Sequence, residues 1–363
     1  MKICFFSPYL PDSFGGGEKH LFDVAGVLAE KHTVHIAISP TNFDEQSYTD
    51  IQKKYERFYG KSLNGFSFIP TPLFTTASAF QKLKWTAQFD ALYCVTDGSL
   101  FFSAAKQNYL HIQIPFTKTL SFVQSIKLMN WQHINVNSQF TQHVIRRSWK
   151  IQNSTVLYPL VEKKAQEKTS QKGKYILGVG RFFTGLHTKR QDILIEIFKE
   201  FVSQYPTESA GWQLILAGSA EDETYVELLK EKAHGLPVQF AINISRAELD
   251  SWYQKARFFI HATGYGIDEQ KHPEQVEHFG ITTVEALQAG AVPLAVGKGG
   301  QKEILTGELA ELMWDTIPAC VEKLRTLIMD EKKYIRLQEL GLIRARDFGS
   351  ERFNKQVITF FNI

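Results

Sequence analysis

The sequence lacks any apolar run long enough to cross a membrane, and this absence sets the first limit on its class. A membrane-spanning helix needs roughly 20 consecutive apolar residues, whereas the apolar stretches of this chain have the length of strands. Met1 leads directly into one of them, residues 2–10, rather than into a basic and apolar leader. We therefore expect a cytoplasmic protein.

Cysteine is scarce, which excludes two further classes. Cys4, Cys94 and Cys320 lie far apart in the sequence and form no Cys-x-x-Cys or Cys/His cluster. A disulfide framework and a zinc site both need several such side chains at short spacing. The three thiols are expected to be reduced and buried.

A strong excess of charge of one sign is also missing. The net charge is +3, although residues 1–160 hold 15 Lys and Arg against 10 Asp and Glu. This excess is too diffuse for a nucleic-acid interface, so no nucleic-acid partner is expected. It suits a peripheral contact with anionic lipid or a phosphorylated acceptor, and it equally suits an ordinary solvated surface.

What the sequence does contain is an alternation of strand-like and helix-like segments along 363 residues, a length that predicts two domains. Apolar runs are followed by turn residues and then by amphipathic stretches, which is typical of parallel sheets with crossover helices. In the second half five such strands are expected, at residues 174–180, 212–218, 238–243, 257–263 and 291–296. The predicted fold class is α/β.

The domain boundaries follow from composition. Residues 1–161 form the first Rossmann-like domain, and residues 162–174 contain almost no apolar side chain and are the expected linker. Residues 175–345 form the second Rossmann-like domain, and 346–363 hold a terminal helix. Its apolar stripe, Phe353, Val357, Phe360 and Phe361, must dock, either on the first domain or on the second.

Two basic side chains follow the first strand of the second domain. Arg181 and Lys189 lie eight residues apart across a glycine-containing turn, where open parallel sheets bind ligands. A guanidinium and an ammonium at this place suit a diphosphate, and a solvated basic loop is the alternative. The stretch GVGRFF has Phe183 where a dinucleotide fingerprint requires its third glycine, so it does not match that fingerprint.

A pair of glutamates marks the next strand-to-helix turn. Glu277 and Glu285 are separated by seven residues, with Gly280 between them and a helix expected from Ile281. Glu277 then lies in a loop that faces a ligand and Glu285 lies more than one turn along the helix. The two carboxylates are placed to hold different parts of one long molecule, unless both are simply surface groups.

These motifs, in this order, resemble the retaining GT-B glycosyltransferases of family 4, the glycosyl transferases group 1. The resemblance extends over nearly the whole chain. It includes Gly15 to Gly17 after the first strand, NSQFT, VLYP before the linker, GRFF with KRQD, EHFG with the second glutamate, and GGQKEI. It implies two Rossmann-like domains with parallel sheets that face each other across a cleft.

The resemblance also implies roles for the side chains of the second domain. Arg181 and Lys189 would bind the donor diphosphate and stabilise the leaving group. Glu277 would contact the transferred sugar, and Glu285 would bind the ribose hydroxyls, since a carboxylate accepts two hydroxyl hydrogen bonds. Backbone N–H groups of Phe279, Gly280 and Ile281 would assist at the phosphates.

In the first domain the resemblance implies close approach of Gly16 and Gly17 to the donor, with a simple tight turn as the alternative. His111 falls where the family often has a histidine near the donor sugar, although a lone histidine in an apolar strand is commonly structural. The stretch 264–276, which carries His272 and Pro273, departs from the family pattern. It either shapes substrate choice or is a surface loop.

The function implied is retaining transfer of a sugar from a UDP- or GDP-sugar, with GDP-mannose a candidate, to a glycan or lipid-linked acceptor. No cofactor and no metal are expected, because the chain contains no Asp-x-Asp motif and offers Arg181 and Lys189 for the diphosphate. A sugar phosphorylase, a sucrose-type synthase and a non-catalytic nucleotide-sugar-binding protein remain alternatives. An NAD-dependent oxidoreductase would need a glycine fingerprint that is missing.

Overall fold

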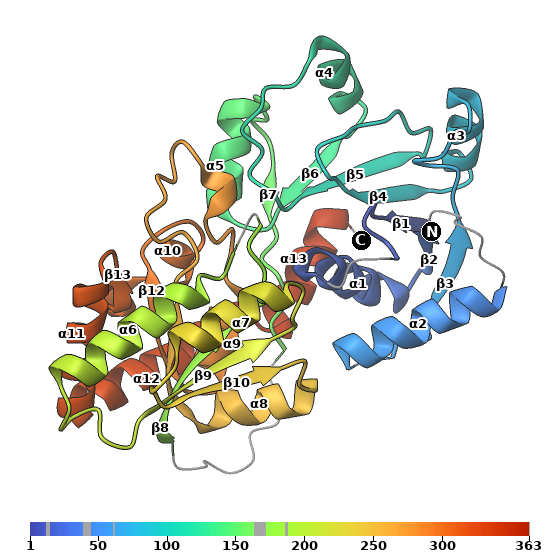
Figure 1. Cartoon of the computed structure of the whole chain (residues 1–363). Helices are drawn as coiled ribbons and strands as arrows, with labels where there is room; N and C mark the ends of the chain where they lie inside the picture. The colour runs from blue at the N-terminus through green and yellow to red at the C-terminus, as the bar shows by residue number, and fades with distance from the viewer. Residues whose placement is uncertain (12–14, 39–44, 61, 163–171, 186–187, 363) are drawn as a thin grey trace. The chain divides into compact units, whose positions relative to one another are not determined.

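The computed structural model describes residues 1–363 except 12–14, 39–44, 61, 163–171, 186–187 and 363 (Figure 1). The chain divides into two compact units. The first consists of Met1–Leu160 with Glu351–Ile363, and the second of Val161–Ser350. Most of the predicted linker, residues 163–171, lies outside the described residues. Each unit is described by itself below.

The first unit is a parallel sheet with helices on both faces. Among its described residues seven strands pair in the order β3-β2-β1-β4-β5-β6-β7. Its elements are β1 Lys2–Phe6, α1 Gly16–Ala29, β2 Thr33–Ile38, α2 Glu45–Tyr59, β3 Phe66–Pro70, α3 Ala79–Thr86, β4 Ala91–Val95, β5 Gln107–Ile112, α4 Phe122–Leu128, β6 His133–Val136, α5 Gln139–Ser148, β7 Thr155–Val156 and α13 Ser350–Phe361.

The apolar run at the start of the chain explains this layering. Side chains alternate between the faces of a strand, so every second residue of a doubly covered strand enters a different core. Ile3 and Phe5 of β1 belong to the cluster that α1, α2 and α13 cover, whereas Cys4 and Phe6 belong to the cluster on the opposite face. A continuous hydrophobic strand at the centre of the sheet results.

The terminal helix α13 packs on the first unit, one of the two options that its apolar stripe left open. Phe353, Val357 and Phe361 are buried in the same cluster as Ile3 and Phe5. The ring of Phe361 stacks on that of Tyr109, with 4.3 Å between the ring centroids. The chain therefore leaves the first unit near residue 160 and returns to it near residue 351.

The second unit is also a parallel α/β sandwich. Its described strands pair in the order β10-β9-β8-β11-β12-β13. Its elements are β8 Gly173–Val179, α6 Gln191–Gln204, β9 Gln213–Gly218, α7 Glu223–Lys232, β10 Val238–Ile242, α8 Arg246–Lys255, β11 Ala256–His261, η1 Pro273–Gln275, α9 Ile281–Gln288, β12 Val292–Val296, α10 Gln301–Ile304, η2 Gly307–Leu312, β13 Met313–Trp314, α11 Ile317–Met329, α12 Glu331–Ala345 and η3 Arg346–Phe348.

The five predicted strands of this unit are present, and the sheet contains a sixth that the sequence pattern does not predict. This strand, β13, has two residues and pairs with Ala295 and Val296 of β12. Two residues are too few to show an alternation. The predicted fold class, two Rossmann-like domains with parallel sheets, is confirmed, and the predicted cleft between them stays a prediction.

Candidate active site

The second unit gathers two polar side chains around the Glu277 carboxylate. Lys189 Nζ lies 2.6 Å from Glu277 Oε2, and His261 Nε2 lies 2.8 Å from the same oxygen. Lys189 precedes α6, His261 ends β11, and Glu277 lies in the loop between η1 and α9. The three groups therefore meet beyond the carboxyl ends of the central strands β8 and β11, the edge at which open α/β sheets bind ligands.

The carboxyl group of Glu277 is ionised in this setting. Burial favours its neutral form, but the Lys189 ammonium and the hydrogen bond from His261 outweigh burial and hold the pKa of Glu277 well below its usual range. Burial lowers the pKa of His261 despite the neighbouring carboxylate, so the imidazole is neutral at pH 7. Since an ionised carboxylate only accepts hydrogen bonds, the proton of His261 lies on Nε2.

The turn that carries Glu277 is fixed by the glycines that follow β12. The N–H of Gly300 donates to the carbonyl oxygen of Glu277 at 2.8 Å. A Cβ atom on Gly300 would lie 2.4 Å from Phe279 Cα, and one on Gly299 would lie 2.1 Å from the Glu277 carbonyl oxygen. Because the backbones touch, the sequence GKGG acts as a rigid support for the residue that presents the carboxylate.

The helix α9 begins directly after this turn. Gly280 adopts φ +117°, a conformation that favours glycine, and Ile281 is the first helical residue. Phe279 is buried, and its ring centroid lies 5.3 Å from that of Phe348. The first N–H groups of a helix have no partner within it and attract anions. This turn therefore places Phe279, Gly280 and Ile281 at such a helix start, and their contact with a phosphate stays a prediction.

A buried amide side chain lies beneath the same turn. Gln301, the first residue of α10, has no exposed surface, and its amide nitrogen and oxygen have no hydrogen-bond partner among the described residues. Its Nε2 atom lies 2.7 Å from the position of a Cβ on Gly280. Buried amides are normally hydrogen-bonded, so Gln301 is a functional candidate, although the sequence analysis gave no role to this residue of the motif GGQKEI.

Arg181 lies in the same region and has different partners from Lys189. Its guanidinium lies 3.2 Å from Glu221 and 5.0 Å from the ring centroid of Phe183. The aliphatic stem of Lys189 passes close to Gly180, where a Cβ would lie 2.3 Å from Lys189 Cγ. Both cations therefore lie beyond the end of β8, but only Lys189 contacts Glu277. The diphosphate role of the pair stays a prediction.

The second glutamate of the pair occupies a separate polar cluster. Glu285 Oε1 lies 2.7 Å from an Arg246 nitrogen, and the hydroxyl of Tyr253 donates to Oε2 at 2.9 Å. Both partners belong to α8. Burial raises the pKa of Tyr253 well above its usual range, and the Glu285 carboxylate adds to this effect. Arg246 and Tyr253 thus hold Glu285 in place, and its contact with a ribose stays a prediction.

The segment 264–276, which departs from the family pattern, is bonded to the glycine support formed by residues 297–300. Lys298 Nζ donates to the carbonyl oxygen of Gly264 at 3.2 Å. The carboxylate of Glu269 accepts from the N–H of Gly299 at 2.8 Å and forms an ion pair with Lys302. The segment therefore packs against the same residues that hold Glu277, which places it beside the candidate site.

The predicted site residues of the first unit lie in two places: Gly16 and Gly17 begin α1, and His111 lies within strand β5. Gly16 is the exposed first residue of α1, and Gly17 is buried, where a Cβ would meet the side-chain amide of Gln113. His111 is fully buried in β5, with Nδ1 3.2 Å from Asn135 Oδ1. Its ring stacks on His20 at 4.2 Å between centroids. This environment is typical of a structural histidine, and the catalytic role of His111 stays a prediction.

Sequence reasoning missed His261, although a signal was present. The stretch RFFIHAT was assigned to a strand, and His261 is its last strand residue. A polar residue at the carboxyl end of a parallel strand is a candidate ligand-binding group from topology alone. Glu221 and Gln301 had no comparable signal, because their positions depend on how the loops after β9 and β12 pack.

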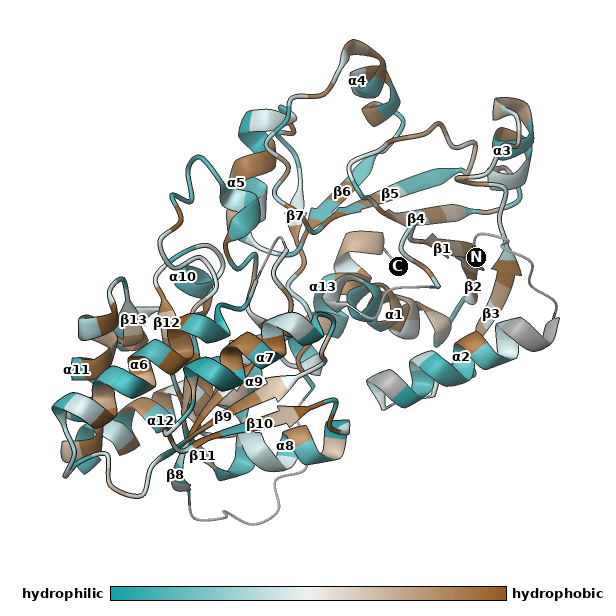
Figure 2. Cartoon of the chain, in the orientation of Figure 1, coloured by the Kyte–Doolittle hydropathy of each residue, from teal (hydrophilic) through white to brown (hydrophobic). Residues whose placement is uncertain are grey.

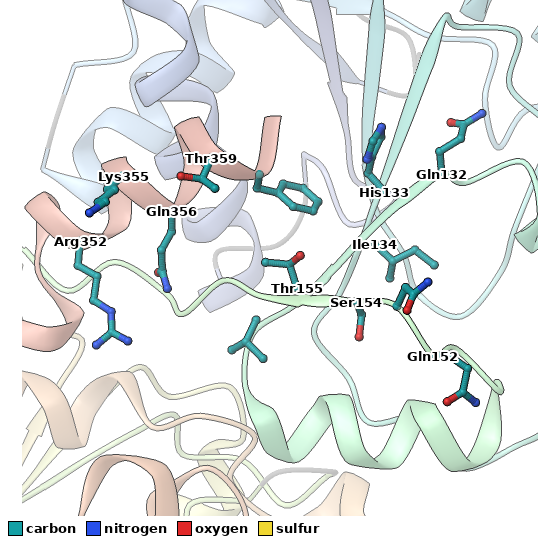
Figure 3. Close-up of a pocket in the computed structure, with 13 residues that line it drawn as sticks. Gln132, His133, Ile134, Gln152, Ser154, Thr155, Arg352, Lys355, Gln356 and Thr359 are labelled. Carbon is teal, nitrogen blue, oxygen red and sulfur yellow. The ribbon is translucent and has the colours of Figure 1, made fainter. Parts of the chain in front are cut away.

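A cavity of about 830 Å³ lies elsewhere, in the first unit (Figure 3). It is lined from the starts of β6 and β7 and from α13, with Gln132, Thr155, Lys355 and Gln356 among its residues. Because it lies at the amino ends of these strands, it is at the opposite edge of the sheet from the usual ligand position. It contains none of the predicted site residues.

Similarity to known proteins bears on the unit that holds Glu277, Lys189 and His261. Residues 161–341 match the sequence model of the family Glycosyl transferases group 1. The chain belongs to this family. The matched group 1 segment falls within the second unit and contains both glutamates, both predicted cations and the glycine support.

The group 1 chain is also similar to curated mannosyltransferases. It is 25% identical over 265 residues to the GDP-Man:Man(3)GlcNAc(2)-PP-Dol alpha-1,2-mannosyltransferase of Dictyostelium discoideum, covering 68% of this chain and 49% of that protein. It is 27% identical over 252 residues to the protein of the same name in Homo sapiens, covering 63% and 47%. The chain thus spans about half the length of the curated relatives it matches.

Solved structures support the fold of this group 1 member. S. aureus TarM, in a complex with UDP among other ligands, superposes with a TM-score of 0.72 at 10% identity over the full length of both chains. WaaG, a glycosyltransferase of lipopolysaccharide biosynthesis, superposes with a TM-score of 0.61 at 14% identity over 99% of each chain. Both support the GT-B class of two Rossmann-like domains.

Proposed function

We propose that the chain transfers a sugar from a nucleotide-sugar donor to a glycan or lipid-linked acceptor. The observation that carries the proposal is the convergence of Lys189, His261 and Glu277 at the carboxyl edge of the second sheet. Within a group 1 family segment, this edge is where the donor would bind. Glu277 is the carboxylate that would contact the transferred sugar, and Lys189 the cation that would bind its diphosphate.

The charges suit this assignment. The Lys189 ammonium has three N–H donors, and one of them forms the hydrogen bond to Glu277. The remaining donors suit phosphate oxygens, whose growing charge an ammonium stabilises as the glycosidic bond to the nucleotide breaks. Glu277, ionised beside it, suits hydroxyl groups of the sugar and the positive charge that develops at its ring. The retaining outcome implied by the family resemblance belongs to this proposal.

The proposed donor is GDP-mannose, and the proposed acceptor is a lipid-linked glycan. The names of the Dictyostelium and human relatives support both, since they specify GDP-Man and a dolichol-linked oligosaccharide. A thermal-shift panel of UDP, GDP, ADP and their sugars tests the donor. At about 100 times its dissociation constant, the correct ligand stabilises the protein by roughly 2.7 kcal/mol. Stabilisation by UDP-sugars alone would overturn the choice of GDP-mannose.

The proposal further includes neutralisation of the diphosphate by Arg181 and Lys189 with no metal. Transfer from labelled GDP-mannose should persist in excess EDTA. Lys189→Met keeps most of the side-chain volume, removes the charge, and should lower the rate on the order of a hundredfold or more. Lys230→Met is the matched control, because Lys230 also pairs with a glutamate, at 2.7 Å, but on the surface of α7. Strict dependence on added Mg²⁺ or Mn²⁺ would contradict the proposal.

A further inference from the structure

The most exposed large apolar side chains of the first unit, among its described residues, lie on or next to two of its helices. Phe80 of α3 is 75% exposed, and Phe122 at the start of α4 and Met129 just after its end are 81% and 82% exposed. Phe122, Ile126 and Met129 are spaced by four and three residues, so they share one face of the helix. In the described part of the second unit, the exposed large apolar side chains are Leu, Ile and Met, none of them aromatic, and lie scattered on α7, α11 and α12.

These two helices contribute little to the core. None of the residues of α4 is buried, and in α3 only Thr86 is. Leu128 and Trp85 contact the cluster beneath, and the opposite faces are left to the exterior. Both helices lie at the same end of the first unit, at the top of the view in Figure 1, and brown and teal residues both occur along α4 in Figure 2. Among the described residues nothing covers their apolar face.

The sequence segment that contains α4 carries charge of one sign. The sequence has no Asp or Glu between Asp97 and Glu162, an interval that contains six Lys and Arg residues. Lys84 of α3 and Lys118 before α4 are exposed, and Lys127 lies within α4. In the described part of the chain none of these three lysines has a carboxylate partner. A partner that combines apolar depth with negative charge matches this surface.

We propose that α3, α4 and the segment around them dock on an anionic membrane, with Phe80, Phe122, Ile126 and Met129 entering the interface between head groups and acyl chains. We call this surface the α3–α4 face. Amphipathic helices with bulky apolar and basic residues bind in this plane without crossing the bilayer. Consistent with such a contact, no helix among the described residues has the length and apolar content of a membrane span.

Membrane docking would bring the protein to a lipid-linked acceptor, which lies at a membrane surface. In this respect the docking proposal rests on the proposed function. The docking itself needs only the α3–α4 face. Basic side chains near an anionic surface each contribute about fivefold to the partition coefficient, and exposed Phe and Met side chains add apolar burial that salt does not screen. Binding should therefore fall with salt without vanishing.

Vesicle flotation of the full chain tests the α3–α4 face. We expect the protein to float with vesicles of phosphatidylcholine containing phosphatidylserine, and hardly with phosphatidylcholine alone. The double variant Phe122→Ser with Met129→Ser should lower the partition coefficient about tenfold or more. Leu228→Ser with Met329→Ser is the matched control, because these side chains of the second unit are also exposed, at 58% and 64%, and it should bind like the unchanged protein. Lys118→Gln with Lys127→Gln should lose about fivefold per lysine on anionic vesicles.

Several outcomes would overturn the proposal. They are wild-type failure to float with anionic vesicles, full binding by the Phe122 and Met129 variant, or equal loss in the control pair. A stable dimer that this variant dissociates would show that a second copy covers the face instead. The nucleotide thermal shift separates the two proposals. A normal shift without vesicle binding overturns the docking face alone, and vesicle binding without a shift by any nucleotide overturns the proposed donor site alone.

Discussion

At the scale of single residues, the site is a carboxylate that keeps its charge in a mostly enclosed position. Glu277 is 15% exposed and Lys189 is 22% exposed in their side chains. An ion pair whose two side chains are mostly shielded from water is sensitive to the loss of either partner, because the remaining charge stays partly buried without compensation. Glu277 and Lys189 therefore depend on each other before any ligand binds.

We predict that Glu277→Gln lowers kcat by about a hundredfold and changes the affinity for the donor nucleotide only modestly. The reason is that a carboxylate at the transferring sugar matters most as positive charge develops. Glu285→Ala, on the helix that would hold the ribose, should instead weaken nucleotide binding and leave kcat nearly unchanged. Steady-state kinetics with nucleotide titrations distinguish the two patterns, and an unchanged kcat in Glu277→Gln would refute the assignment.

A second prediction concerns the buried histidines of the first unit. Burial, with a smaller effect of Lys19, lowers the pKa of His20 to about 3, while the unfolded chain has an ordinary value near 6.5. The contribution of the neutral His20 ring to the free energy of unfolding is therefore complete above pH 6.5. It is lost as the pH falls from there toward 3, by up to about 1.4 kcal/mol per pH unit. Among the described residues neither ring nitrogen of His20 has a hydrogen-bond partner, so His20→Phe sacrifices no described hydrogen bond and should reduce this loss.

Urea unfolding of the His20→Phe variant at pH 7 and pH 5 measures the effect. The variant should lose less stability than the unchanged protein between the two values. Burial, with a smaller effect of His20 itself, lowers the pKa of His111, so His111 keeps in the variant only the part of its contribution that burial causes. His234→Gln, at an exposed position of the second unit, serves as the control and should leave the difference unchanged. Equal acid sensitivity of all three proteins would show that His20 has no part in it.

Part of the site follows from the sequence because its signals are local. The spacing of Glu277 and Gly280 before an amphipathic stretch predicts a loop carboxylate at a helix start, as the structure has it. The partners of that carboxylate do not follow. His261 and Lys189 lie 16 and 88 residues away in the chain, and only sheet topology brings them together. The pairing of Arg181 with Glu221 likewise depends on two loops of adjacent strands.

At the scale of elements, the start of α9 is defined by its contact with the loop after β12. Gly300 has φ −64°, which suits any residue, so its need for glycine is purely steric. We predict that Gly300→Ala pushes the 277–280 turn away from its support, because the new Cβ would overlap backbone atoms that have no side-chain freedom. A displacement near 1 Å at a reacting group costs about a hundredfold in rate.

The measurement is kcat/KM for sugar transfer together with a thermal midpoint. Gly26→Ala is the control, since a Cβ at Gly26 in α1 meets no atom of the described residues within 4 Å, and it should be neutral or slightly stabilising. A Gly300→Ala enzyme with normal kcat/KM would show that the turn tolerates the shift. A large loss of folding in Gly300→Ala alone would instead make the contact a structural one.

Strands that are buried on both faces are predictable from the sequence, whereas very short or exposed strands are not. Strands β1, β4, β8 and β9 are apolar runs with a neighbouring strand on each side, where burial on both faces imposes a clear pattern. The edge strands β7 and β13 have two residues each, and β3 has intermediate or exposed side chains throughout. Their pairing depends on neighbouring strands, so their own composition does not reveal them.

At the scale of the whole molecule, the first unit is built from two separate segments of the chain. Phe353, Val357 and Phe361 enter its core from α13, and full burial of each such side chain contributes about 1.5 to 3 kcal/mol. Their sum is comparable with the roughly 5 to 15 kcal/mol that stabilises a typical domain. A chain that ends at Gly349 should therefore have an unfolded or proteolytically sensitive first unit.

Limited proteolysis of the shortened chain tests this. We expect residues 1–160 to be degraded while a fragment close to residues 161–349 resists. Phe361→Ala in the full chain should destabilise by about 3 to 5 kcal/mol, whereas Ile358→Ala, at a position that is 43% exposed, should have little effect. Resistance of residues 1–160 in the shortened chain would show that α13 is dispensable for that unit.

The return of α13 to the first unit has a consequence for the order in which a ribosome allows the protein to fold. Residues 1–160 emerge first but cannot complete their core, because α13 is translated only after the whole of the second unit. The second unit, contiguous in the chain, is free to fold as soon as it has emerged. During synthesis residues 1–160 therefore wait, with the core positions of Phe353 and Phe361 unfilled, until the residues that follow the second unit have been made.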